Sequence, residues 1–123
     1  MTPRSAEGAV FARVSYVRYP PEHHDAGLRF VREELLPALR QAPGYRGCHF
    51  LTDGRPGTGL ALVFWESEEA ADAASADRRV IAARVKLAVF GLAIESRKIY
   101  EVVAHDEYGE EPVGWPSAGR PPP

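Results

Sequence analysis

The chain has 123 residues, of which 45% are hydrophobic and 26% are charged, so it can form one hydrophobic core of ordinary composition. The formal net charge is −2 and the 13 arginines are scattered along the sequence, which argues against a nucleic-acid-binding surface. No stretch is long and apolar enough to span a membrane, and residues 1–8 lack the apolar centre of a signal peptide. We therefore expect a cytoplasmic protein. Cys48 is the single cysteine, which excludes a disulfide within the chain.

The N-terminal third predicts one strand followed by one helix. Residues 9–19 are rich in β-branched and aromatic side chains and predict a strand, which a pair of prolines ends. A helix is expected over residues 22–41, because apolar residues recur there at three- and four-residue spacing: Leu28, Val31, Leu35 and Leu39. Pro37 lies within this pattern and predicts either a kink or an early end near Leu36.

Residues 45–53 and 59–65 predict an antiparallel hairpin with a glycine-rich turn between its strands. Residues of both parities are apolar along 59–65, so both faces of this strand need a cover. If the hairpin pivots at Pro56, Trp65 lies opposite Gly47 and His49 lies opposite Val63. That register places His49 and Trp65 on the same face of the sheet, whereas a slip by one residue reverses the assignment.

A second helical region is expected over residues 68–92. Ser67 can cap its first turn, and Asp77 can break the region and cap a second piece. Gly91 is a plausible C-terminal stop. Residues 94–104 then predict a fourth strand.

The order β-α-β-β-α-β predicts an α+β, ferredoxin-like fold with a four-stranded antiparallel sheet and two helices on one face. The other face is apolar, and the economical cover is the same face of a second copy, so we expect a homodimer. We assign residues 9–104 to this domain and residues 1–8 to a flexible N-terminus. Residues 105–123 are rich in proline and glycine, and we expect an extended or disordered tail, with an arm across a partner subunit as the alternative.

Three segments carry a resemblance to a known family: Pro-Gly-Tyr-Arg-Gly at 43–47, Val-Phe-Trp-Glu-Ser-Glu-Glu-Ala at 63–70, and Tyr-Glu-Val-Val at 100–103. The chain looks like an antibiotic biosynthesis monooxygenase (ABM) domain of the dimeric α+β barrel superfamily. The resemblance covers roughly residues 9–104 and implies a pocket between sheet and helices in each subunit. In the active branches of the family it also implies oxygen chemistry without a bound metal or flavin, and hence no cofactor.

The catalytic residues of that family match only in part. Cofactor-free, quinone-forming members are associated with an asparagine, a tryptophan and an arginine around a phenolic substrate. Trp65 matches the tryptophan, and the second helix offers Arg78, Arg79 or Arg84, of which Arg84 is our candidate for ligand binding. The chain contains no asparagine. Heme-degrading members need an asparagine and a histidine on the second helix, and the chain lacks both, so the heme interpretation fails.

Four residues besides Arg84 are candidates for a site. Trp65 could stack on a flat ligand and donate its indole N–H, or it could be a core tryptophan at a strand end. His49 could act as a base, because a histidine exchanges protons near neutral pH, or it could be a satisfied strand residue. Tyr16 and Tyr45 could add hydroxyl donors to the pocket, although tyrosines in such strands more often pack.

Other polar clusters favour structural interpretations. His23, His24 and Asp25 are adjacent on a predicted helix and point in different directions, so a solvated first turn is favoured over a metal site. We therefore expect no metal. Cys48 is expected to be an inert strand residue.

Two functions remain open. The first is a monooxygenase-like protein that needs no cofactor and that binds, and as an enzyme would oxidise, a planar aromatic or polyketide-type molecule. The alternative is a non-catalytic binding or accessory domain whose pocket is filled by its own side chains. The size of the pocket discriminates between them.

Overall fold

The computed structural model describes residues 9–106, and the predicted N-terminal segment and nearly all of the predicted tail lie outside this range. The elements follow in this order: β1 (Phe11–Arg18), a 3₁₀ turn (Pro21–His23), α1 (His24–Phe30), a π-helical turn (Val31–Leu35), α2 (Leu36–Gln41), β2 (Tyr45–Leu51), β3 (Thr58–Trp65), α3 (Glu68–Ser75), α4 (Arg78–Val89) and β4 (Ala93–Glu101). This is the predicted β-α-β-β-α-β order.

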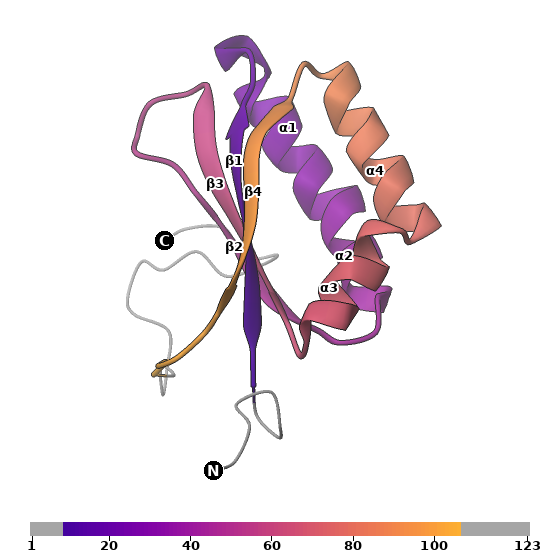
Figure 1. Ribbon diagram of the computed structural model, residues 1–123. Coiled ribbons are helices and arrows are strands. Elements are labelled where there is room, and N and C mark those ends of the chain that lie inside the picture. Colours follow the sequence, from indigo (N-terminus) through magenta and orange to yellow (C-terminus); the bar gives the residue numbers. More distant parts are fainter. Residues whose placement is uncertain (1–8, 107–123) are drawn as a thin grey trace.

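The four strands form one antiparallel sheet in the order β2-β3-β1-β4. All helices lie on one side of it (Figure 1). The α+β, ferredoxin-like prediction is therefore confirmed. None of the helices in residues 9–106 is long and apolar enough to cross a bilayer.

The first helical region adapts to Pro37 instead of ending before it. Proline has no N–H, so the carbonyl of Glu33, four residues earlier, cannot receive the usual helical hydrogen bond. The chain widens into the π-helical turn Val31–Leu35 just before this position and then continues as α2 to Gln41. An early end near Leu36 was the wrong alternative.

Local capping fixes the second helical region as predicted. Ser67 Oγ accepts a hydrogen bond from the amide of Ala70 at 3.0 Å. Asp77 Oδ1 accepts from the amides of Arg79 at 2.9 Å and Val80 at 3.2 Å, and so begins α4 after the break. Gly91 takes a φ of +90°, which favours glycine, and ends the helix.

The hairpin register differs from the prediction by one residue. Trp65 lies opposite Tyr45, and His49 lies opposite Leu62, with an irregularity between Tyr45 and Gly47. The turn pivots between Arg55 and Pro56, not at Pro56. A shift of one residue moves a strand's side chains to the other face, so His49 and Trp65 lie on opposite faces of the sheet.

The core lies between the sheet and the helices. Buried side chains from both layers form one cluster around Trp65, which is 3% exposed. The opposite face of the sheet carries Val14, Leu60, Leu62 and Phe64, with Tyr16 53% exposed beside them. The predicted apolar character of both faces is thus confirmed, whereas a second copy as the cover of this open face stays a prediction.

Candidate functional site

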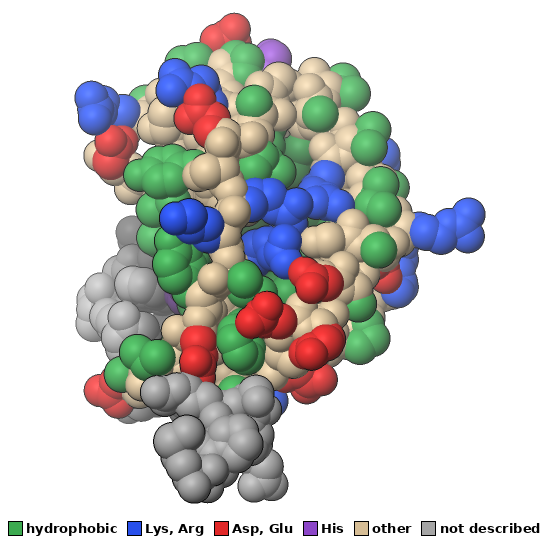
Figure 2. Space-filling view, in the orientation of Figure 1, with side chains coloured by type: hydrophobic (Ala, Val, Ile, Leu, Met, Phe, Trp, Pro, Cys, Tyr) green, Lys and Arg blue, Asp and Glu red, His purple; other side chains and the backbone are tan. Residues whose placement is uncertain are grey.

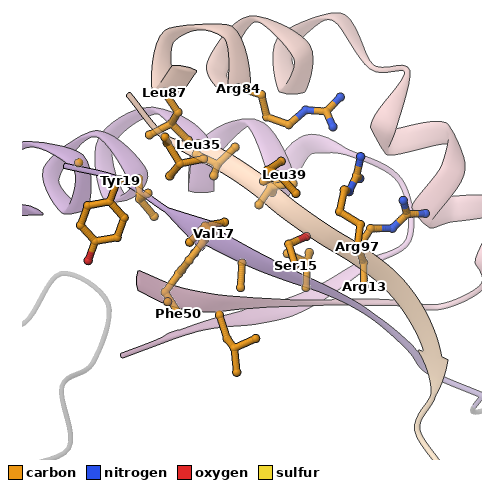
Figure 3. Close-up of a pocket in the computed structure, with 18 of the residues that line it drawn as sticks. Arg13, Ser15, Val17, Tyr19, Leu35, Leu39, Phe50, Arg84, Leu87 and Arg97 are labelled. Atoms are coloured by element: carbon orange, nitrogen blue, oxygen red, sulfur yellow. The ribbon is translucent and has the colours of Figure 1, made fainter. Parts of the chain in front are cut away.

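A cavity of about 340 Å³ lies between the sheet and the helices (Figure 3). Its floor is formed by β1 and β3, whose residues of one parity face the helices. Its roof is the apolar stripe of the first helical region, together with α4. The lining is mainly apolar and includes Val17, Leu35, Leu39, Phe50 and Leu87. A space of this size is within the roughly 300–1,000 Å³ typical of small-molecule sites.

One end of the cavity carries three arginines from three different elements. Arg13 on β1, Arg84 on α4 and Arg97 on β4 lie together in the close-up (Figure 3). Figure 2 shows Lys and Arg side chains gathered at the middle of the molecular surface in that view, between β4 and the helices. We call these three residues the arginine cluster. Of the three candidate arginines on the second helical region, Arg84 is the one that lines the cavity.

Ser75 joins two members of the arginine cluster. Arg84 Nη2 donates to the Ser75 carbonyl oxygen at 2.8 Å, and Arg97 Nη2 donates to Ser75 Oγ at 3.1 Å. Arg13 Nη2 forms an ion pair with Asp72 at 2.9 Å. Burial, and then the charges of Arg13 and Arg84, lower the pKa of Arg97 below its usual value. The cluster is therefore a region of concentrated positive charge at the edge of an apolar space.

The other end of the cavity carries a tyrosine and two histidines. The Tyr19 hydroxyl and His24 Nδ1 are 2.7 Å apart and share a hydrogen bond. His23 Nδ1 lies 2.5 Å from the carbonyl oxygen of Phe90, to which it donates in the matching tautomer. Both histidines are half-buried and line the cavity. The expectation of a solvated first turn at His23 and His24 is therefore wrong, because hydrogen bonds to Tyr19 and to the Phe90 carbonyl hold both imidazoles at the cavity wall.

Trp65 lines the cavity and is also part of the core. Its ring meets the ring of Tyr45 edge to face, with centroids 5.8 Å apart. Tyr45 pairs with this tryptophan across β2 and β3 and is not one of the cavity-lining residues. Burial, with a hydrogen bond to Cys48, raises the pKa of Tyr45 far above its usual value. Tyr45 therefore supports Trp65 and is a neutral packing residue.

Two sequence candidates face away from the cavity. His49 lies on the open face, where its ring meets Phe64 edge to face at 5.9 Å between centroids. Tyr16 lies on the same open face, opposite Leu60. Neither lines the cavity. Placing His49 and Tyr16 in a pocket with Trp65 was wrong, because the hairpin register and the strand parity put them on the other side of the sheet.

Sequence reasoning missed the arginine, tyrosine and histidine side chains that line the cavity besides Arg84, namely Arg13, Tyr19, His23, His24 and Arg97. Arg13 has the parity of Val17 on β1, and this alternation was the signal that could have found it. Tyr19 follows directly after the end of β1. Arg97 reaches the cavity through long-range packing, and His24 through the 3₁₀ turn that precedes it, and no sequence pattern identifies either. Within residues 9–106, no group of three or more His, Cys, Asp or Glu side chains is arranged to hold a metal ion.

Comparison with known proteins supports the fold and leaves the activity open. No family model matches the chain. Uncharacterized proteins from two strains of Mycobacterium tuberculosis are 35% identical to it over 69 residues, which are 55% of this chain and 29% of theirs. The chain therefore spans under a third of the length of these curated relatives.

Several solved structures share the architecture. A "putative antibiotic biosynthesis monooxygenase" from Chloroflexus aurantiacus matches with a TM-score of 0.59 and 19% identity, over 81% of this chain and 97% of that one. A monooxygenase from the ActVA-Orf6 gene of Streptomyces coelicolor, in complex with nanaomycin D, matches with a TM-score of 0.60 and 16% identity, over 84% of this chain and 93% of that one. The chain thus has the fold of ABM-like domains.

Proposed function

We propose that this protein binds a planar aromatic or polyketide-type molecule in the cavity and oxidises it with molecular oxygen, without a cofactor. The observation that carries the proposal is the apolar cavity of about 340 Å³. A domain whose pocket is filled by its own side chains would leave a much smaller space. The similarity in fold to a monooxygenase that holds nanaomycin D supports a ligand of this class.

The residues around the cavity suit the binding of a flat ring system. Val17, Leu35 and Phe50 offer apolar surfaces from the strand and helix layers. Trp65 is held edge to face against Tyr45, so its indole is fixed in one orientation at the cavity wall. A rigid aromatic wall positions a flat ligand at low cost in conformational entropy.

The oxidation needs a proton acceptor, and His24 takes this role in the proposal. An anthrone loses a proton from its ring CH₂ or its enol, and the resulting anion passes electrons to O₂. The balanced reaction converts the CH₂ group to a carbonyl, consumes one O₂ and releases one water. Tyr19, which shares a hydrogen bond with His24 at 2.7 Å, orients the imidazole and can relay the proton. His49 has no part in it.

Oxygen uptake with 1,8-dihydroxyanthrone tests this function. The unchanged protein should consume oxygen faster than the uncatalysed reaction does. It should form one quinone for each O₂ that it consumes. His24→Ala and Trp65→Phe should slow the reaction, whereas His49→Ala should retain its rate, because His49 lies on the other face of the sheet. Uptake no faster than the uncatalysed rate would refute the oxidation and leave ligand binding without chemistry, which is the alternative function.

The open face supports a homodimer as part of the proposal. Leu60, Leu62 and Phe64 on β3, with Val14 on β1, form an apolar surface that water would otherwise contact. Packing two such faces about a twofold axis gives the dimeric α+β barrel expected from the resemblance to ABM domains. Multi-angle light scattering at micromolar concentration should give twice the mass of the chain, and a monodisperse monomer would contradict the dimer.

A further inference from the structure

The arginine cluster holds more positive charge than its protein partners balance. Among the ion pairs within residues 9–106, its three guanidinium groups take part in one, between Arg13 and Asp72, and the Asp72 side chain is 75% exposed. Arg84 and Arg97 both donate to Ser75, which is neutral. Cations brought together beside an apolar space are unfavourable unless an anion joins them.

Arg13 adds a more specific sign of a missing partner. Its side chain is 18% exposed, and its Nε atom is buried without a hydrogen-bond partner in the part of the chain that the structure describes. Buried N–H groups nearly always donate a hydrogen bond, and a buried N–H group without an acceptor lowers the stability of the fold. The cluster also faces Ser15 on the cavity floor, whose hydroxyl can contribute to the same group of donors (Figure 3).

We infer that the arginine cluster binds a carboxylate of the ligand, so that the substrate of the cavity is an aromatic or polyketide-type carboxylic acid. This inference rests on the proposed function and names the class of its substrate. A planar guanidinium group donates two parallel hydrogen bonds to a carboxylate, and three such groups surround one end of the cavity. The apolar rings of the ligand then lie along Val17 and Leu35, towards Tyr19.

Two fluorescent probes of nearly the same shape test the inference. Anthracene-2-carboxylate carries the charge, and 2-(hydroxymethyl)anthracene is its neutral counterpart. In titrations at pH 7 the carboxylate should bind the unchanged protein about tenfold more tightly or better, because charge-assisted hydrogen bonds exceed neutral ones. This preference should shrink as salt is raised from low to high concentration. The comparison requires no variant, so a misfolded variant cannot obscure it.

Substitutions of single arginines then show which residues cause the preference for the carboxylate probe. Arg84→Gln and Arg97→Gln should each lower the affinity for the carboxylate about tenfold and leave the affinity for the alcohol within about twofold. Arg78→Gln is the matched control, because Arg78 is an exposed arginine on the same helix as Arg84 and does not line the cavity. It should bind both probes as the unchanged protein does.

The outcomes separate the inference from the function on which it rests. Equal affinity for the two probes, or a carboxylate preference that survives both cluster substitutions, would overturn the inference and leave an aromatic-binding cavity in place. Failure of both probes to bind would overturn the proposed function as well. A preference that disappears in Arg84→Gln and Arg97→Gln, and persists in Arg78→Gln, supports the carboxylate site.

Discussion

Replacing Trp65 by alanine tests whether this residue anchors the fold as well as lining the cavity. The side chain is 3% exposed and lies in the core cluster against Tyr45. Removing a buried aromatic ring typically costs about 3–5 kcal/mol. The cavity already leaves space on one side of the indole, so fewer contacts are lost and we expect about 3 kcal/mol, a large part of a typical stability of about 5–15 kcal/mol.

Urea denaturation followed by far-ultraviolet circular dichroism measures this loss, at one fixed protein concentration because a dimer's stability depends on it. Val103→Ala is the control, since Val103 is 76% exposed and its loss should change stability by less than about 0.5 kcal/mol. A loss below about 1 kcal/mol in Trp65→Ala would refute the anchoring role and leave Trp65 as a ligand contact alone.

Four further substitutions test other parts of the account. Ser67→Ala removes the cap of α3 and should cost about 1 kcal/mol in urea denaturation, and an unchanged midpoint would contradict the capping role. The backbone amide of Val80, and then that of Arg79, hold the pKa of Asp77 below its usual value, so its stabilising effect is present above about pH 4 and disappears as the pH falls. Asp77→Asn should therefore lose less stability on acidification than the unchanged protein does. Burial raises the pKa of Tyr45, so stability should fall as the pH rises above about 10, and Tyr45→Phe should weaken that fall. Leu62→Glu puts a charge on the open face and should give a monomer in light scattering, whereas a persistent dimer would place the interface elsewhere.

The fold could be predicted because its signals are local. The caps at Ser67 and Asp77 and the stop at Gly91 each act within one helical turn, and the structure keeps all three. The apolar residues of both parities on β3 required covers on both faces of the sheet. Helices supply one of these covers in the structure (Figure 1).

The hairpin register could not be predicted, because the turn controls it and the composition of the turn allows more than one pivot. In the structure the Arg55 amide donates to Asp53 Oδ1 at 3.0 Å, and Gly54 takes a φ of +92°. These features place the pivot between Arg55 and Pro56, and an extra residue at Arg46 then adjusts the pairing near Tyr45. This one-residue shift in register decided that His49 lies on the open face of the sheet.

The polar residues at the two ends of the cavity were harder to predict from the sequence than the register was. Arg13, Arg84 and Arg97 come together from two strands and a helix, across separations that no motif spans. His24 meets Tyr19 because the Pro20 and Pro21 pair directs the chain into a 3₁₀ turn and not straight into a helix. The arginine contacts arise from tertiary packing and the His24 contact from one irregular turn, so sequence patterning could indicate a pocket without identifying its chemistry.

Calorimetric titration with 1,8-dihydroxyanthraquinone tests the central claim, which is that the cavity holds a planar ligand. Gly27 lines the cavity, and a Cβ added there would meet no atom within 4 Å, so the side chain in Gly27→Leu starts from open space and should occupy part of the cavity. Ala26→Leu is the matched control, because Ala26 is the exposed neighbour on the same helix. We expect one ligand per chain, at least tenfold weaker binding in Gly27→Leu, and unchanged binding in Ala26→Leu. Equal binding by all three proteins, or no binding by the unchanged protein, would contradict it.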